Sequence, residues 1–146
     1  MKKILTIAIA LFMLCPLMSA QIQIKQNAKM EKIATISASW YYLYYSDGEY
    51  ILSLKSTNQF DDSYWLHLGN KEEALLSLDA LIDLCDSLGK DDSVEISNGA
   101  KKTYFVHRYM GGLSFHQKEP GMAGFTSMTK AYLKKTHAKI KEHNAK

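Results

Sequence analysis

The sequence predicts an α+β protein in which helices pack on one face of an antiparallel sheet. Segments rich in β-branched and aromatic residues form two separate blocks, within residues 33–68 and 93–116. Each block is followed by a segment in which apolar residues recur at helical spacing. The dipeptides Asp47-Gly48 and Asn98-Gly99 are typical of two-residue hairpin turns. The predicted order is β-β-β-α-β-β-(β)-α.

The first twenty residues have the layout of a secretory signal peptide. A charged start is followed by an apolar run, residues 4–17, and small residues precede Gln21. We therefore expect cleavage near Ala20-Gln21 and a periplasmic or secreted protein. The run is shorter than the ~20 residues that a spanning helix needs, and we expect no transmembrane segment after the signal is removed. Lipid anchoring at Cys15 is an alternative that the bulky Leu14 before it disfavours.

Removal of the signal peptide would leave 126 residues, the length of one domain. Residues 21–32 are predicted to be a flexible leader or an edge strand, and residues 33–146 a single α+β domain that ends in a basic helix. The net charge falls from +3 to +1 without Lys2 and Lys3, so charge gives no reason to expect a specific nucleic-acid partner. Cys85 would be the single remaining cysteine, which excludes an internal disulfide.

Residues 33–45 are predicted to form the first strand. A two-residue turn at Asp47-Gly48 would then return the chain along residues 50–55, and residues 64–68 would form a third strand. This turn places Tyr45 opposite Tyr50 and Leu43 opposite Leu52. One face of the hairpin is consequently apolar and is the predicted core face: Tyr41, Leu43, Tyr45, Tyr50, Leu52 and Leu54.

The opposite face of these strands is the candidate site. It carries aromatic rings together with polar groups, and we call it the aromatic face: Trp40, Tyr42, Tyr44 and Trp65, with Lys55 and His67. Three explanations are open. Another part of the chain covers the rings, or the face binds a protein partner or a second copy, since Tyr and Trp are favoured at interfaces. In the third explanation the rings stack on a glycan.

The first helix is predicted over residues 71–88. Asn70 and Glu73 form a capping-box pattern, and Gly89 is a typical C′ residue. In the second block we expect strands at residues 93–97, 102–110 and 113–116, with a bend or bulge at Gly111-Gly112. The final helix would be capped by Thr126 or Ser127. The repeated triplet Asp-Asp-Ser, at 61–63 and 91–93, is weak evidence for two similar halves.

Charge is distributed unevenly between the two predicted helices. Residues 61–95 carry ten acidic residues and two lysines, whereas residues 127–146 carry six lysines and one glutamate. Two solvated helix faces that attract each other would explain this pattern. A basic helix that touches an anionic envelope surface or an acidic partner is the functional alternative.

Catalytic and metal-binding patterns are weak. The five histidines lack the spacing of a zinc site, and the sequence has no nucleophile elbow or glycine-rich phosphate loop. We therefore expect no metal and no cofactor. The predicted function is that of a small, exported, non-enzymatic binding domain, a possible homodimer, that uses the aromatic face. The alternative is a small envelope hydrolase that uses His107 or Cys85.

Overall fold

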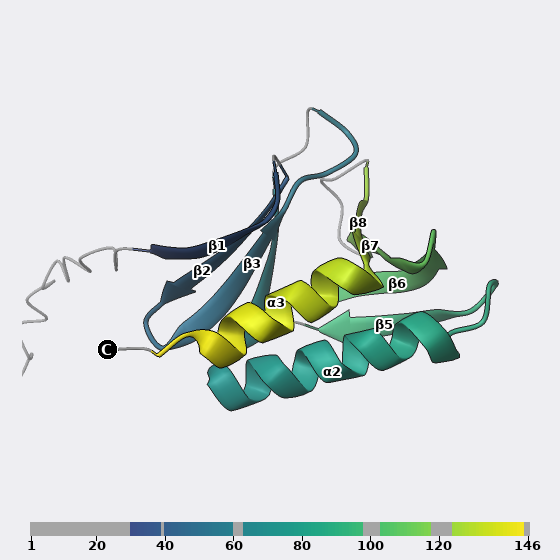
Figure 1. The fold of residues 1–146 in the computed structure, drawn as a ribbon. Helices are drawn as coiled ribbons and strands as arrows, with labels where there is room; N and C mark the ends of the chain where they lie inside the picture. The colour runs from purple at the N-terminus through teal and green to yellow at the C-terminus, as the bar shows by residue number, and fades with distance from the viewer. Residues whose placement is uncertain (1–29, 39, 60–62, 98–102, 118–123, 145–146) are drawn as a thin grey trace, which may run out of the picture.

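The computed structural model describes residues 30–38, 40–59, 63–97, 103–117 and 124–144. The predicted signal peptide, Cys15 and most of the predicted leader lie outside these residues. The α+β class is confirmed, because two antiparallel sheets pack against two helices (Figure 1). No helix in the described ranges is long and apolar enough to cross a membrane.

The strands form two four-stranded antiparallel meanders rather than a single sheet. The first sheet consists of β1 (Glu31–Ser37), β2 (Tyr41–Ser46), β3 (Glu49–Leu54) and β4 (Tyr64–Gly69). The second sheet consists of β5 (Ser93–Ser97), β6 (Thr103–Tyr109), β7 (Gly112–Gln117) and β8 (Thr126–Thr129). Helix α2 (Lys71–Ser87) follows the first sheet, and α3 (Lys130–Glu142) follows the second.

The chain therefore repeats one topology, four strands and then a helix. The Asp-Asp-Ser triplets do not mark this repeat. The triplet at 91–93 precedes the first strand of its half, whereas the triplet at 61–63, of which residues 61 and 62 lie outside the description, precedes the fourth strand. The two triplets thus occupy non-equivalent positions.

The predicted hairpin register is confirmed. Leu43 pairs with Leu52 and Tyr45 with Tyr50, and Leu66 of β4 continues the same row beside Leu52. Asp47 and Gly48 have φ angles of +52° and +85°, both positive as a type I′ turn requires. The core face is buried or half-buried along its whole length.

The first predicted strand is in fact two strands. β1 and β2 are separated by a turn before Tyr41, with a hydrogen bond of 3.4 Å from the Trp40 amide to the Ser37 carbonyl. Residues 33–45 contain no glycine or proline, and the common turn residues among them are Ser37 and Ser39 alone. The residues on both sides of the turn have high β-propensity, so the sequence pattern did not separate β1 from β2.

Helix α2 begins as predicted. The Asn70 side chain accepts from the Glu73 amide, and the Glu73 carboxylate accepts from the Asn70 amide. The helix ends at Ser87 with Leu88 as its C-cap, and Gly89 does not adopt the left-handed conformation expected of a C′ glycine. The buried residues form the predicted stripe: Ala74, Leu78, Leu81 and Cys85.

The start of the final helix was predicted incorrectly. Thr126 and Ser127 lie in β8, and Thr129 caps α3 by accepting from the Tyr132 amide. β8 forms because Thr126 and Met128 are buried opposite Phe115 and Leu113 of β7. This tertiary pairing outweighs the capping preference of the two hydroxyl residues.

The two halves are interlocked by their helices. α2 contacts β3 and β4 of the first sheet and β7 of the second, while α3 contacts β1 and β8. Figure 1 shows the two helices side by side across one side of both sheets. The core lies between the helices and the sheets, and its side chains come from both sheets and both helices. One face of each sheet is consequently left without a helix.

Candidate binding surface

The aromatic face lies on the helix-free side of the first sheet. Strand residues alternate between faces, and Leu43, Leu52 and Leu66 point into the core. Tyr42 and Tyr44 of β2, and Trp65 and His67 of β4, therefore point away from the helices. Trp40 and Lys55 continue the same face just beyond β2 and β3, where the Lys55 amide donates to the Trp40 carbonyl at 3.1 Å.

Three of the predicted rings come together over the central strand. The ring centroids of Tyr42 and Tyr44 are 6.3 Å apart, and those of Tyr44 and Trp65 are 5.9 Å apart. Between them lie Ile51 and Ser53 of β3, which are only 8% and 5% exposed although no helix covers this side. The rings of the flanking strands therefore bury the outward side chains of β3.

The outermost rings remain open to solvent. Trp40 is 47% exposed and Trp65 is 36% exposed. Tyr42 and Tyr44 are half-buried. Exposed rings of this size are a large apolar area for a small domain to leave in water.

Two lysines cover ring faces at this surface. The Lys55 ammonium lies 4.1 Å from the centroid of the Trp40 ring, and the Lys32 ammonium lies 4.0 Å from that of Tyr42. Such contacts contribute about 0.5–1 kcal/mol each at exposed positions. Lys32 was missed by sequence reasoning because β1 had not been separated from β2; pairing with Tyr44 brings it to this side.

His67 has a partner that the sequence did not indicate. Its Nδ1 atom lies 3.5 Å from a carboxylate oxygen of Glu49 at the end of β3, and the two form an ion pair when the imidazole is protonated. The aromatic face thus has cations over Trp40 and Tyr42 and a carboxylate beside His67. It is amphipathic, as protein interfaces commonly are.

The helix-free side of the second sheet carries a further set of rings, which we call the second-sheet cluster: Tyr109, Phe125, His116 and His107. Consecutive centroids in this order are 5.3, 5.0 and 5.3 Å apart. The pKa of His116 lies below its ordinary value, mainly because burial disfavours the charged ring and also because His107 lies beside it.

Sequence reasoning missed this cluster. His107 and Tyr109 lie two residues apart on β6 and therefore share a face, but no spacing in the sequence indicates that His116 of β7 lies beside them. Phe125 lies in a segment that shows no strand pattern. Its place is fixed by two hydrogen bonds to Thr57: the Thr57 amide donates to the Phe125 carbonyl, and the Phe125 amide donates to the Thr57 hydroxyl.

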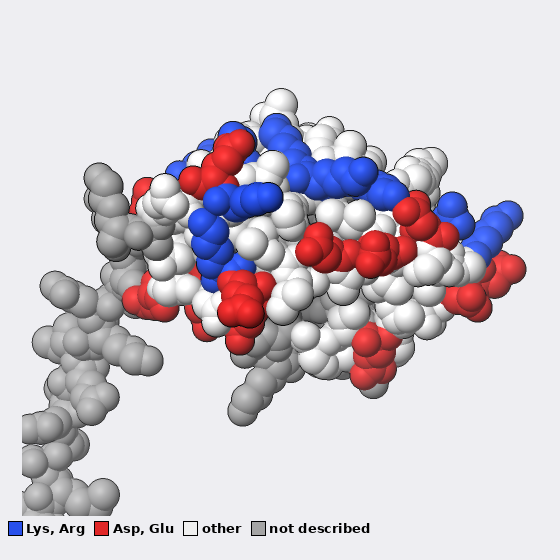
Figure 2. All heavy atoms as spheres, turned by 60° about the horizontal axis from the view of Figure 1, so that its bottom comes forward, with Lys and Arg blue, Asp and Glu red and all other residues white. Residues whose placement is uncertain are grey.

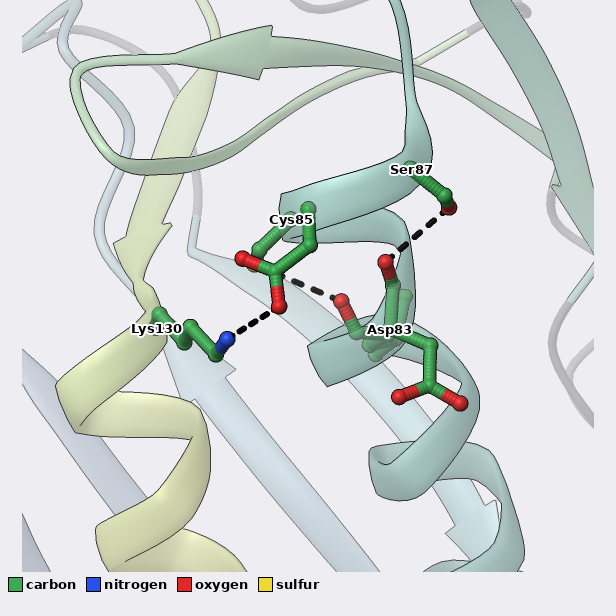
Figure 3. Close-up of polar contacts among 6 residues, drawn as sticks. Asp83, Cys85, Ser87 and Lys130 are labelled. Atoms are coloured by element: carbon green, nitrogen blue, oxygen red, sulfur yellow. Dashed lines mark hydrogen bonds and ion pairs between the residues drawn. The ribbon is translucent and has the colours of Figure 1, made fainter.

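Cys85 has the surroundings of a structural thiol. It is buried in the stripe of α2, and its Sγ donates to the Leu81 carbonyl at 3.4 Å (Figure 3). Burial raises the pKa of the thiol, which disfavours the nucleophilic thiolate. His107 lies on the helix-free side of the second sheet, whereas Cys85 faces the core. The two therefore cannot form a catalytic dyad.

No group of three or more metal-ligating side chains occurs among the residues that the structure describes. His107 and His116 are adjacent, but the cluster continues into Phe125 and Tyr109 rather than into further ligands. The arrangement supports apolar contact better than metal coordination.

The charges of the two helices are partly used within the fold. Lys130 of α3 forms an ion pair with Asp86 of α2, which lowers the pKa of that carboxyl group, and His137 lies 3.3 Å from Asp79. Figure 2 shows a row of lysine and arginine side chains beside a row of aspartate and glutamate side chains. This contact favours the interpretation in which the two helices attract each other, while Lys134 and Lys141 are exposed.

No protein family, no curated protein and no solved structure is detectably similar to this chain.

Proposed function

We propose that this protein is a small, exported, non-enzymatic binding domain, and that the aromatic face contacts a protein partner. The observation that supports this most strongly is the exposure of Trp40 and Trp65 on a sheet face that neither helix covers. Tryptophan, tyrosine and charged groups around a central apolar patch are typical of interaction hot spots.

The geometry favours a protein over a glycan. A sugar would stack on a flat ring face, but one face of Trp40 and one of Tyr42 are already occupied by lysine ammonium groups. Tyr44 and Trp65 are inclined to each other by 36°, so they do not form one flat platform. A protein surface with an acidic group among apolar side chains would satisfy both the lysines and the rings.

The chain has two tryptophans, and both belong to this face. Tryptophan fluorescence, excited selectively over that of the tyrosines, therefore reports on the proposed surface alone. In the free protein we expect iodide to quench a large part of the emission, and a bound partner to protect it. Full protection from iodide in a protein that sediments as a monomer would contradict the proposal.

Once a binding protein has been isolated from envelope or secreted fractions, the variant Trp40→Ala/Trp65→Ala should weaken its affinity by about 30-fold or more, the effect of removing a hot spot of about 2 kcal/mol. Met110→Ala is the matched control, since Met110 is an exposed apolar side chain on the β6–β7 turn. Equal affinity of the double variant and the control would locate the interface elsewhere. Self-association would instead be detected as a concentration-dependent sedimentation coefficient that the double variant lacks.

Export is a part of the proposal that has its own test. We expect the processed protein to begin at Gln21, which N-terminal sequencing or intact mass measurement can determine. A chain that retains residues 1–20 in the cytoplasm would contradict this part and leave the binding surface to be tested separately.

A further inference from the structure

A groove opens between β4, β5 and α2. Its walls are Leu66 and Leu68 of β4 and Ile96 of β5, and Ala80 and Leu84 of α2 form its floor. We call it the β4–β5 groove. Its volume is about 220 Å³ and its lining is mainly apolar.

Both walls are edge strands. Among the described strands, β4 pairs with β3 alone and β5 pairs with β6 alone. The other two edges are modified in ways that discourage further pairing. β1 is interrupted by two register shifts, and β8 has only four residues. The β5–β6 ladder, in contrast, runs through five pairs without a shift, and the β3–β4 ladder has a single shift at one end, between Tyr50 and Ile51.

The floor of the groove continues into exposed apolar surface. Leu76, one helical turn before Ala80, is 63% exposed although α2 is otherwise acidic on its outer side. Leucine, alanine and leucine at positions 76, 80 and 84 thus form an apolar strip along the flank of α2 that borders the groove. Neither α3 nor a described strand covers this strip at Leu76.

The size of the groove selects the kind of occupant. Drug-sized ligands and cofactors occupy pockets of about 300–1,000 Å³, whereas a cavity of about 150 Å³ holds a molecule the size of benzene. A volume of about 220 Å³ suits one or two apolar side chains. An extended peptide would deliver such side chains at every second residue while its backbone paired with a strand edge.

The negative charge near the groove indicates that the bound peptide should carry basic side chains. The chain carries a net charge of −8 between residues 61 and 95, the segment that contains both α2 and the start of β5. Two acids of α2 are bound by α3, but Asp83 and Glu72 are exposed on the outer side of α2. Figure 2 shows acidic side chains spread over the part of the surface that carries this helix.

We propose that the β4–β5 groove binds an extended segment of a partner protein by strand addition, with apolar side chains entering the groove and lysine or arginine side chains facing the acidic surface. The bound strand would pair with β4 or β5 and extend that sheet. The groove adjoins the aromatic face, because His67 belongs to both, but its apolar walls and floor are formed by other residues. The proposal does not depend on the function proposed for the aromatic face.

The probe is a synthetic heptapeptide that alternates valine and lysine, titrated into the isotopically labelled protein while backbone amide shifts are followed by NMR. We expect shifts at residues 66–68 and 94–97. Ala80→Trp would fill the groove and weaken binding by about tenfold or more. Ala138→Trp on α3 is the matched control, because both alanines are exposed on a helix, and it should bind as the unsubstituted protein does.

Two further peptides separate backbone pairing from charge. A heptapeptide of valine and glutamate should bind more weakly because the acidic surface repels it, and one with methylated backbone nitrogens should not bind because it cannot pair. The proposal is wrong if the valine–lysine peptide shifts no amide of β4 or β5, or if Ala80→Trp binds as well as Ala138→Trp. Equal binding of the glutamate or methylated peptide would also overturn it. Shifts of the same amides with protein concentration alone would identify a second copy as the occupant instead.

Discussion

The two halves of the molecule share a topology but present different chemistry on their helix-free faces. The first sheet exposes tryptophan and tyrosine rings beneath lysine ammonium groups. The second sheet presents two histidines in contact with each other and with Phe125 and Tyr109. The inner faces, by contrast, are alike in being apolar and buried.

The fold constrains the inner faces of the two sheets but not their outer faces. The inner residues of both sheets must pack against the same pair of helices, so their apolar character is dictated by the core. The outer residues carry no such constraint, and the two halves differ there in their response to pH. Lysine keeps its charge over the physiological range, whereas histidine changes charge within it.

The largest expected effect tests whether the halves are one cooperative unit. Leu52 and Leu113 are each fully buried, one in each sheet. Leu52→Ala and Leu113→Ala should each lower the free energy of unfolding by about 2–5 kcal/mol. Because α2 and α3 contact both sheets, each variant should shift a single urea transition.

Tryptophan emission reports on the first sheet alone, and far-ultraviolet circular dichroism reports on the whole protein. The two signals should give one midpoint in each variant. If Leu113→Ala left the urea midpoint of the tryptophan signal unchanged, the two halves would unfold independently and would be separate domains.

A smaller effect is expected at the two equivalent hairpin turns. The turn after β2 has Gly48 at φ +85°, while the turn after β6 has Met110 at φ +43° beside Gly111 at +74°. Gly48→Ala should lower the free energy of unfolding by about 1 kcal/mol, because an added Cβ meets no atom but the left-handed backbone is unfavourable. Met110→Asn should raise it by up to about 1 kcal/mol, since asparagine tolerates this conformation better.

Thermal or urea unfolding measures both turn variants. Met110→Leu is the control, because it keeps the unfavourable conformation with a side chain of similar size. A stabilisation by Met110→Leu equal to that by Met110→Asn would mean that the exposed side chain, and not the backbone, sets the stability of this turn.

The smallest expected effect concerns acid stability of the second sheet. The pKa of folded His116 is lowered by burial, whereas unfolded histidine is protonated below its ordinary value of 6.5. Below pH 6.5 the unfolded state binds more protons than the folded state. The contribution of His116 to the free energy of unfolding is therefore retained above pH 6.5 and is lost as the solution is acidified toward the lowered pKa. His116→Gln should flatten this part of the profile when urea unfolding is measured between about pH 7.5 and 5.

Phe125→Ala provides a second measurement at the same position. It should expose His116, and NMR titration should then show the pKa of the ring moving back toward 6.5. An unchanged acid dependence in His116→Gln would show that other groups dominate acid stability and that the second-sheet cluster is not the pH-sensitive part of the molecule.

Sequence patterns predicted those elements that local chemistry determines. The Asp47-Gly48 turn fixed the register of β2 and β3, and through it the two faces of the first sheet. The capping box located the start of α2. The β1–β2 turn and β8 were not found, because the first has no glycine, proline, asparagine or aspartate and the second depends on burial against β7.

The aromatic face could likewise be predicted only in part. Tyr42, Tyr44 and Trp65 follow from alternation once the register is known, and the structure brings their rings together. Lys32 and Phe125 do not follow from it, since each is placed by contacts outside the three predicted strands. The β4–β5 groove is a property of how two sheets meet, for which no local pattern exists.

The contact between α3 and β1 sets the order in which this chain can reach its final form. The Lys135 ammonium donates to the Ile36 carbonyl, 99 positions earlier in the sequence. At the C-terminal end of α3, the Lys71 ammonium donates to the carbonyls of Lys141 and His143, and the Tyr50 hydroxyl hydrogen-bonds to His143 Nδ1. Residues 130–142 must therefore have been synthesised before β1 can contact α3. Contacts between residues so far apart in the sequence form slowly, so the docking of α3 on β1 is expected to be a late step of folding.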